Sequence, residues 1–250
     1  MDLPASIEAA WGLRERPQRG PKPGLSLTRI VAAGVKVAEA EGLAGVSMNR
    51  VAAELGAAPM SLYRYVPSKD ELIALMVDAV FGVPPEPAGP GEDWRDGLSR
   101  WAWAMRGVMY AHAWALRVPI SGLPARPHEV AWFECALASL DGTGLTEAQK
   151  ASVIMLISGY VRIEASTGTD IAAAVRASGT SANEWMGAYG RLLAKLADPQ
   201  RFPALATFIA SGVFDVADGP DDEFIFGLDR ILDGIGSLVT ARSAPPEPAA

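Results

Sequence analysis

The chain has few of the residues from which reactive centres are built, because its 250 residues include only one cysteine and two histidines. The single cysteine, Cys135, excludes an internal disulfide and is compatible with a reducing cytoplasm. His112 and His128 are 16 residues apart, which matches no metal-binding or helical pair. Neither a phosphate-binding loop nor a dinucleotide-binding glycine motif is present. We therefore expect a protein that is not an enzyme and that uses no metal and no cofactor.

Long apolar runs and strand-like alternation are also missing. The longest apolar stretches are broken by Gly, Glu or Arg well short of the roughly 20 residues that a membrane-spanning helix needs. Asp2, Glu8 and the arginines that follow leave no apolar core for a signal peptide. Apolar residues recur instead at helical spacing, so we expect an all-α, cytoplasmic protein with no membrane contact.

Four short helices are predicted in the first third of the chain. Serine precedes three of them, where its hydroxyl can cap the first turn, and glycine follows two of them, where it relieves left-handed strain. Proline suits the first turn of the remaining helix, since its missing N–H would be unpaired there. The predicted helices are 27–41 after Ser26, 48–55 after Ser47, 59–65 beginning at Pro59, and 69–80 after Ser68.

The predicted helix 59–65 combines a narrow apolar stripe with exposed polar and aromatic residues. Leu62 and Val66 lie four residues apart and can face an interior, which leaves residues 61 and 63–65 mostly on the outer surface. Tyrosine, serine and arginine on such a surface suit phosphates and base edges. The alternative is that the tyrosines are half-buried packing residues of an ordinary small bundle, and for a single tyrosine both interpretations remain open.

Seven segments of this region together form a recognisable pattern. They resemble the DNA-binding domain of the TetR family of bacterial transcriptional regulators, and the resemblance covers that domain without a gap. The segments are Ile30-Val31-Ala32-Ala33, Glu41-Gly42, Val46-Ser47-Met48, Val51-Ala52, Leu55-Gly56, Ser61-Leu62-Tyr63-Arg64-Tyr65-Val66 and Lys69-Asp70-Glu71-Leu72.

The resemblance implies particular contacts to double-stranded operator DNA. Tyr63, Tyr65 and their neighbours would touch phosphates and bases, and Lys69 would bind a phosphate. Asn49 departs from the family, whose members often carry a guanine-binding arginine there, whereas asparagine prefers adenine. The predicted DNA-binding residues are Ser47, Asn49, Arg50, Pro59, Met60, Ser61, Tyr63, Arg64, Tyr65 and Lys69.

The charge distribution agrees with a DNA-binding N-terminal part. The whole chain carries a net charge of −7 and a pI near 5.0, which alone argues against nucleic acid. Residues 11–69, however, contain nine basic and four acidic side chains, whereas the residues from 84 onward contain 13 basic and 20 acidic ones. Residues 1–24, rich in Pro, Gly and Arg, are predicted to be a flexible basic arm that either enters the minor groove or serves as a solubilising tail.

A proline- and glycine-rich stretch, residues 84–91, predicts a domain boundary. Residues 25–83 would form a three-helix helix-turn-helix domain, residues 92–242 a larger helical ligand-binding and dimerisation domain, and residues 243–250 a disordered tail. Helical patterns in the second domain cover 94–112, 130–140, 146–166, 185–196, 204–211 and 223–239.

The last predicted helix is apolar around most of its girth and contains Gly227, Gly234 and Gly236, which favours close packing against another helix. We expect it to form a four-helix bundle with helix 146–166 and their copies in a homodimer, although a buried core helix of a monomer is the alternative. The segments 202–205, 214–215 and 224–235 also resemble the tetracycline-repressor-type regulatory domain. The predicted dimer residues are Ile154, Ile157, Val161, Phe224, Leu228, Ile231, Ile235 and Leu238.

Large, adaptable side chains in the middle helices predict a small-molecule pocket, although at least half of them can be plain packing residues. Glu164 is a lone carboxylate on an apolar helix, so it must reach solvent, meet a ligand or pair with an arginine such as Arg162 or Arg117. The predicted pocket residues are Trp101, Met105, Met109, Trp114, Trp132, Phe133, Met155, Tyr160 and Glu164.

Taken together, these patterns predict a homodimeric repressor that a small-molecule effector releases from an inverted-repeat operator. An activator or a ligand-independent DNA-binding regulator would share the same N-terminal domain. A small helical enzyme or ligand carrier is the more distant alternative.

Overall fold

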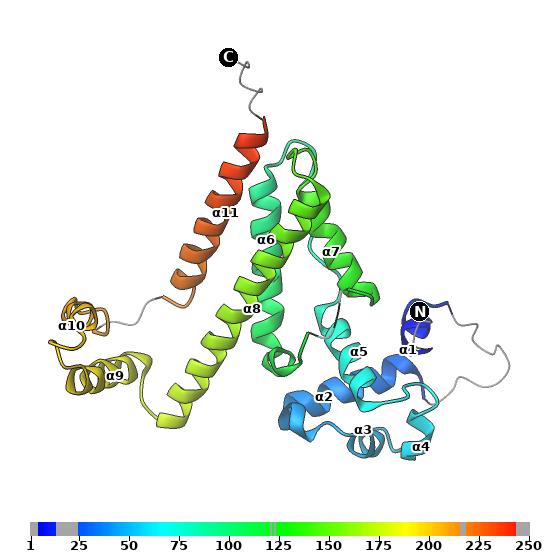
Figure 1. Ribbon diagram of the computed structural model, residues 1–250. Helices are drawn as coiled ribbons and strands as arrows, with labels where there is room; N and C mark the ends of the chain where they lie inside the picture. The colour runs from blue at the N-terminus through cyan, green and yellow to red at the C-terminus, as the bar shows by residue number, and fades with distance from the viewer. Residues whose placement is uncertain (1–4, 14–24, 121, 123, 216–218, 244–250) are drawn as a thin grey trace.

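The computed structural model describes residues 5–13, 25–120, 122, 124–215 and 219–243, and every regular element in these ranges is a helix (Figure 1). The all-α fold predicted from the sequence is therefore confirmed. None of these helices is long and apolar enough to cross a membrane. The elements are α1 (Ala5–Ala10), α2 (Leu27–Gly45), α3 (Met48–Glu54), α4 (Pro59–Leu62), α5 (Lys69–Phe81), α6 (Trp94–Ala111), the 3-10 helix η1 (Ala113–Arg117), α7 (Pro127–Ser139), α8 (Glu147–Ser178), α9 (Ala182–Leu196), α10 (Pro203–Ala210) and α11 (Asp222–Ser243).

Helices α2 to α5 form the lower end of the molecule in Figure 1, and the predicted caps begin three of them. The hydroxyls of Ser26, Ser47 and Ser68 each accept a hydrogen bond from the backbone N–H three residues later, at 3.1 to 3.2 Å. Gly42 has φ 72° and interrupts α2 at the predicted end of its regular helix. The caps and the glycine stop were thus predicted correctly.

Helix α4 is shorter than predicted, since it ends at Leu62 and residues 63–65 continue as turns. The backbone N–H groups of Tyr65 and Val66 both donate to the carbonyl of Leu62. Pro67 disfavours the helical conformation in the residue before it, so the chain leaves the helix while Val66 still reaches the core. Both Leu62 and Val66 are fully buried, as their spacing predicted.

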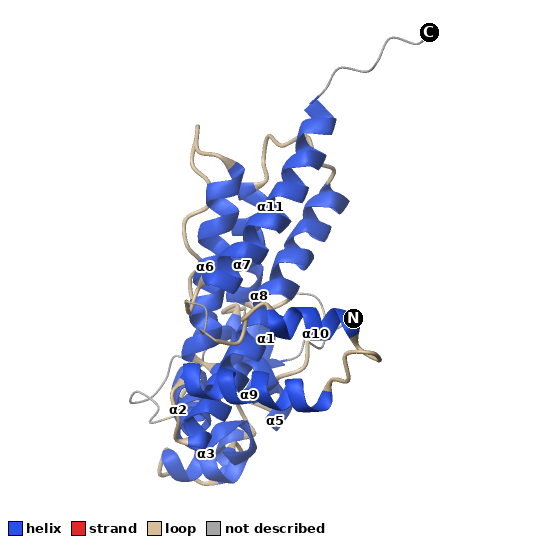
Figure 2. Ribbon diagram, turned by 90° about the vertical axis from the view of Figure 1, so that its left-hand side faces the viewer, coloured by secondary structure: helices blue, strands red, loops and turns tan. Residues whose placement is uncertain are grey.

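Helices α6, α7, α8 and α11 form the body (Figures 1 and 2). Helix α8 extends twelve residues beyond its predicted end at 166, because the alanine-rich segment that follows favours helix without an apolar stripe, and Gly179 ends it with φ 69°. Helices α9 and α10 pack on each other at the far end of α8, beside the body in Figure 1.

The two groups of helices share a hydrophobic core. Trp114 and Ala115 of η1 are buried in the cluster built by α2, α3 and α5, which includes Ile30, Val51 and Leu72. The proline-rich loop 84–91 connects α5 to α6, but η1 from the second group completes the core of the first. The division into domains ending at 83 and beginning at 92 remains a prediction.

The start of the chain differs from the predicted flexible arm. Residues 5–10 are helical, and Trp11 Nε1 donates to the carbonyl of Ala125 at 2.8 Å, so this part packs against the loop before α7. The prediction of a flexible arm is therefore wrong for residues 5–13, because a helix and a hydrogen bond to the loop before α7 order them. Its basic residues from Arg14 to Lys22 lie outside the described residues, as do residues 244–250 of the predicted tail.

A buried carboxylate joins α5 to α7. Asp78 Oδ1 accepts hydrogen bonds from the backbone N–H groups of His128 and Glu129, both at 3.0 Å, and Asp78 Oδ2 lies 2.9 Å from Nδ1 of His128. The Asp78 residue is only 5% exposed. A helix begins with unpaired N–H groups and a partial positive charge, so a carboxylate from another helix stabilises both α7 and the contact between the two helices.

We expect Asp78→Asn to lower the free energy of unfolding by about 2–4 kcal/mol, since it removes a charged acceptor from two buried N–H groups and a histidine. Chemical denaturation measures this loss. The matched control is Glu134→Gln, an exposed carboxylate on the same α7, which should change stability by less than about 0.5 kcal/mol. Equal effects of the two substitutions would contradict the capping role of Asp78.

Candidate nucleic-acid interface and regulatory core

Helices α3 and α4 meet at a tight turn and lie at the outer end of the molecule (Figure 1). Gly56 adopts φ 64° in that turn, a conformation that glycine tolerates best. Val51 and Ala52 of α3 and Leu62 of α4 are fully buried, so they hold the pair against α2 and α5. The opposite side chains of the pair are consequently turned to solvent.

The predicted DNA-binding residues fall into an open group and an occupied group. The open group has exposed side chains in the free protein: 74% of Met60 and 43% of Tyr63 are accessible. Ser61 and Pro59 are half-buried on the same helix. The exposed members are Asn49, Met60, Tyr63, Arg64 and Lys69.

The side chains of the occupied group already form hydrogen bonds within the protein. Ser47 caps α3, as described above, and Arg50 donates to Glu41 and Glu54, whose carboxylates raise the pKa of its guanidinium. Tyr65 is half-buried and its hydroxyl donates to the carbonyl of Leu25 at 3.2 Å. For Tyr65, the packing alternative considered from the sequence therefore describes the free protein.

The predicted pocket residues are divided between two hydrophobic clusters and the surface. Trp101 is 1% exposed and donates through Nε1 to the carbonyl of Trp132, and Met105 and Met109 are buried beside it in the body. Trp114 belongs to the other cluster, packed under α2, where its Nε1 has no hydrogen-bond partner among the described residues. Met155 is 73% exposed. Most of these side chains therefore pack in the core, as the packing alternative expected, and their place in a ligand pocket stays a prediction.

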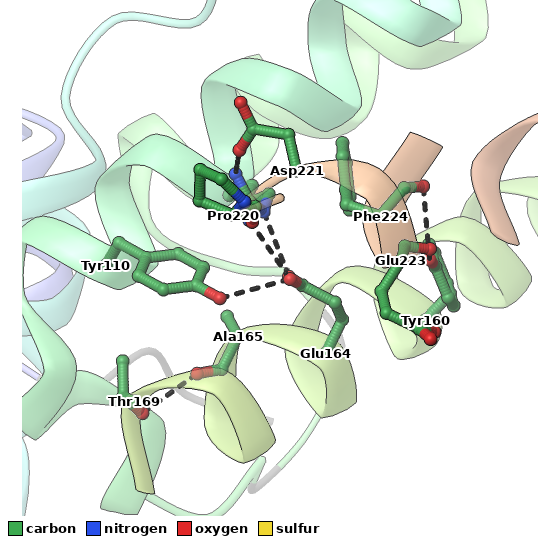
Figure 3. Close-up of polar contacts among 10 residues, drawn as sticks. Tyr110, Tyr160, Glu164, Ala165, Thr169, Pro220, Asp221, Glu223 and Phe224 are labelled. Atoms are coloured by element: carbon green, nitrogen blue, oxygen red, sulfur yellow. Dashed lines mark hydrogen bonds and ion pairs between the residues drawn. The ribbon is translucent and has the colours of Figure 1, made fainter. Parts of the chain in front are cut away.

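Glu164 pairs with an arginine, as one of the alternatives proposed, but with Arg106 of α6 and not with Arg162 or Arg117. Its carboxylate accepts from Nε and Nη2 of Arg106, both at 3.1 Å, and from the hydroxyl of Tyr110 at 3.0 Å (Figure 3). Arg117 pairs instead with Asp170 on the surface. Sequence spacing along one chain cannot reveal which of several arginines a fold brings to a carboxylate.

Arg106 also binds two acceptors at the start of α11. Its Nη1 donates to Asp221 at 2.7 Å and its Nη2 to the carbonyl of Pro220 at 2.8 Å, at the entrance to α11. Its guanidinium also lies over the rings of Tyr110 and Phe224, 4.5 and 4.8 Å from their centroids. Figure 3 shows how these groups join α6, α8 and the start of α11. The cluster is thus a structural clamp in which four of the five N–H groups of Arg106 form hydrogen bonds.

A different cavity, of about 270 Å³, lies where α5, η1, α7 and α8 meet. None of the nine predicted pocket residues lines it. Its described wall contains alanines, aliphatic side chains and three charged residues but no aromatic residue or methionine, so the search for large adaptable side chains in the sequence did not find it. Its wall includes Ala74, Val77, Ala115, Val118, Pro119, Ile120, Arg126, Glu129 and Arg162.

The predicted dimer residues mostly face the core of their own chain. Ile154, Ile157, Val161, Phe224, Leu228 and Ile235 are at most 5% exposed, so they cannot contact a second copy, and the prediction is wrong for them. Ile231 is half-buried and Leu238 is 37% exposed. The close approach expected at Gly227 is also internal, because a Cβ there would lie 2.2 Å from the hydroxyl of Tyr160 in α8.

The neighbouring positions on the same two helices are the exposed ones. A shift of one residue turns a helical side chain by about 100°, which moves it from the core face to the outer face. We call this set the α8–α11 outer face: Met155, Leu156, Ile163, Ile225 and Phe226, which are between 45% and 73% exposed.

A short helix pair, buried at its back and open in front, is the arrangement of a helix-turn-helix DNA-binding protein. The family described as "Bacterial regulatory proteins, tetR family" matches residues 30–76, and "Tetracyclin repressor-like, C-terminal domain" matches residues 86–239. The HTH-type transcriptional repressor DrrR1 of Streptomyces coeruleorubidus is 40% identical over 249 residues, which are 99% of this chain and 90% of that protein.

Solved structures agree with these matches. Apo ActR from Streptomyces coelicolor gives a TM-score of 0.71 at 25% identity, covering 89% of this chain and 100% of ActR. The TetR family protein ActR in complex with actinorhodin gives 0.70 at 27% identity, covering 88% and 99%. The chain therefore belongs to the TetR family, as the sequence resemblance implied, and is a DNA-binding transcriptional regulator.

The clamp around Arg106 makes a testable contribution to stability. Glu164→Gln should lower the free energy of unfolding by about 2–4 kcal/mol, because it leaves a largely buried guanidinium with less negative charge beside it. The control is Asp170→Asn on the same α8, which breaks an exposed pair with Arg117 and should cost at most about 1 kcal/mol. Thermal and chemical denaturation of the two variants measure the difference, and an equally small loss in both would show that the clamp is not structural.

Proposed function

We propose that the protein is a homodimeric, cytoplasmic repressor without catalytic activity. It binds an inverted-repeat operator through α3 and α4 and leaves it when a small molecule binds the body. The observation that supports this most is the open group of exposed residues, Asn49, Met60, Tyr63, Arg64 and Lys69, which protrudes from a helix pair buried at its back. DrrR1, a relative named as a repressor, supports repression as the mode of regulation. The ActR complex with actinorhodin supports regulation by a small molecule.

The roles proposed within the open group follow from chemistry. Tyr63 and Arg64, just after α4, can reach phosphates and base edges, and Lys69, at the first turn of α5, suits a phosphate. Asn49 on α3 suits an adenine. Arg50 would have to exchange Glu41 or Glu54 for a phosphate before contributing, so we assign it a smaller share.

The proposed dimer is formed by the α8–α11 outer face, in place of the buried residues predicted from the sequence. Five large apolar side chains exposed on two adjacent helices are what an interface between two copies would cover. A dimer of this kind has to hold its two α4 segments about 34–36 Å apart, one turn of DNA, to reach both halves of an inverted repeat.

Helix α5 is the proposed route from ligand to DNA. It begins at Lys69 in the DNA-binding end, carries Asp78 at the contact with α7, and lends Ala74 and Val77 to the wall of the cavity. A ligand that fits only one spacing of the two DNA-binding ends would lower operator affinity by its difference in affinity between the two states.

The operator prediction is tested with full-length protein and DNA from upstream of its own gene, with random DNA as competitor. Lys69→Ala should weaken binding to operator and random DNA alike and reduce the slope of log affinity against log salt by about 1. Tyr63→Ala should weaken operator binding by about five-fold or more while leaving the dimer intact. Lys150→Ala in the body is the control and should change neither. Unaltered operator affinity in both variants would refute the assignment of this surface.

The dimer prediction is tested by light scattering and sedimentation. Phe226→Glu and Ile163→Glu should each convert the dimer into a folded monomer, because each places a charge in an apolar interface. Val83→Glu changes an equally apolar side chain, 85% exposed in the loop after α5, and should remain dimeric. If both outer-face variants stay dimeric, the two copies meet elsewhere.

A further inference from the structure

The cavity between α5, η1, α7 and α8 contains one positive charge that the described part of the protein does not neutralise. Three charged residues line it: Arg126, Glu129 and Arg162. Arg126 and Glu129 form an ion pair, and Glu129 Oε2 also accepts from the backbone N–H groups of Ala125 and Arg126. These two residues cancel each other, so the net charge of the cavity is that of Arg162.

Arg162 is held in place without a counter-ion. Its Nη2 donates to the carbonyls of Leu116 and Val118, at 2.8 and 2.6 Å, and no carboxylate among the described residues forms an ion pair with it. A guanidinium has five N–H groups. Two carbonyl bonds therefore leave Nε–H and the two N–H groups of Nη1 available, while burial lowers the pKa of Arg162. By contrast, Arg106 on the neighbouring helix α6 forms ion pairs with two carboxylates, those of Glu164 and Asp221, which neutralise its charge.

We propose that this cavity binds a compact, largely apolar organic carboxylate, whose negative group accepts hydrogen bonds from the free N–H groups of Arg162. A volume of about 270 Å³ is close to the low end of small-molecule sites, about 300–1,000 Å³, and suits a ligand of one to three rings. Ala74, Val77 and Ala115 provide apolar wall for such a ring. A carboxylate would compensate a half-buried charge that two carbonyls compensate only in part.

This proposal rests on the proposed function and names the ligand class and the site that it needs. The ligand would touch α5 through Ala74 and Val77, and it would touch the segment from Ala115 to Val118, whose carbonyls hold Arg162. It would therefore lie between the helix that carries the DNA-binding end and the helices of the body. A neutral or cationic ligand would leave the charge of Arg162 unpaired.

Direct binding to the full-length protein tests the proposal. Isothermal titration calorimetry would compare benzoate, 1-naphthoate and 9-anthracenecarboxylate with their primary amides, which have the same shape and no charge. At least one acid should bind about ten-fold more tightly than its amide, because a charge-assisted hydrogen bond is lost in the amide. Arg162→Met, which keeps most of the aliphatic stem, should abolish that preference, and Arg162→Lys should restore part of it.

Two further variants serve as controls in the binding experiment. Arg176→Met removes an exposed arginine near the end of the same α8, away from the residues that line the cavity, and it should bind the acid as the wild type does. Ala74→Phe fills the cavity without touching the charge, and it should lose the acid and the amide together. Circular dichroism checks that each variant folds. If Arg162→Met does not fold, the acid and amide affinities of Arg162→Lys and Ala74→Phe decide whether the proposal stands.

The proposal is overturned if no acid of the series binds at millimolar concentration, if acid and amide bind equally, or if Arg162→Met binds the acid as tightly as the wild type. Operator binding is measured separately on the same preparations. Arg162-dependent binding of an acid that leaves the protein–DNA complex intact would preserve this site and refute release by that ligand. Loss of operator binding by the ligand-free wild type would refute the proposed function alone.

Discussion

The buried carboxylate of Asp78 connects the DNA-binding helices to the body. It is placed on α5, which belongs to the DNA-binding end, and it accepts the first free N–H groups of α7, which belongs to the body. Trp114 strengthens the same junction from the other side, since η1 inserts it into the core under α2. Because both contacts cross between the two groups of helices, α5 cannot move without changing the packing of α7 and η1. A regulator of the TetR family needs such a connection between its body and its DNA-binding end.

Two arginines, Arg106 and Arg162, differ in whether carboxylates compensate their charge. Arg106 forms ion pairs with Glu164 and Asp221 and lies over three aromatic rings, so it holds α6, α8 and α11 together. Arg162 lies on α8 at the junction, where its partners among the described residues are two backbone carbonyls. One arginine therefore stabilises the fold and the other keeps an uncompensated charge, because compensation depends on which carboxylates the packing brings near. The uncompensated arginine lies in the cavity that α5 shares with the body.

Local features of the sequence predicted local features of the fold well. Ser26, Ser47 and Ser68 cap their helices, and Gly42 and Gly56 adopt positive φ where a stop or turn was expected, since a cap depends only on a few adjacent residues. The start of α8 at the capping box of Thr146 was predicted, whereas its end was not, because residues after 166 pack against little and lack an apolar stripe. Tyr65 was placed on the outer surface, yet the fold brings the carbonyl of Leu25, forty residues earlier, to its hydroxyl.

The amino-acid sequence by itself determined the helical class, the helix-turn-helix with its caps and exposed residues, and the family, because these follow from short-range patterns read along the chain. Tertiary structure alone decided which face of α8 and α11 is core and which is exposed, since a rotation of about 100° per residue exchanges Ile154 for Met155. It also decided that Glu164 pairs with Arg106, that Asp78 caps α7, and that Arg162 binds two backbone carbonyls and no carboxylate of the described residues. Each of these contacts joins residues at least 44 positions apart, and helical periodicity carries no information about which helix will lie opposite.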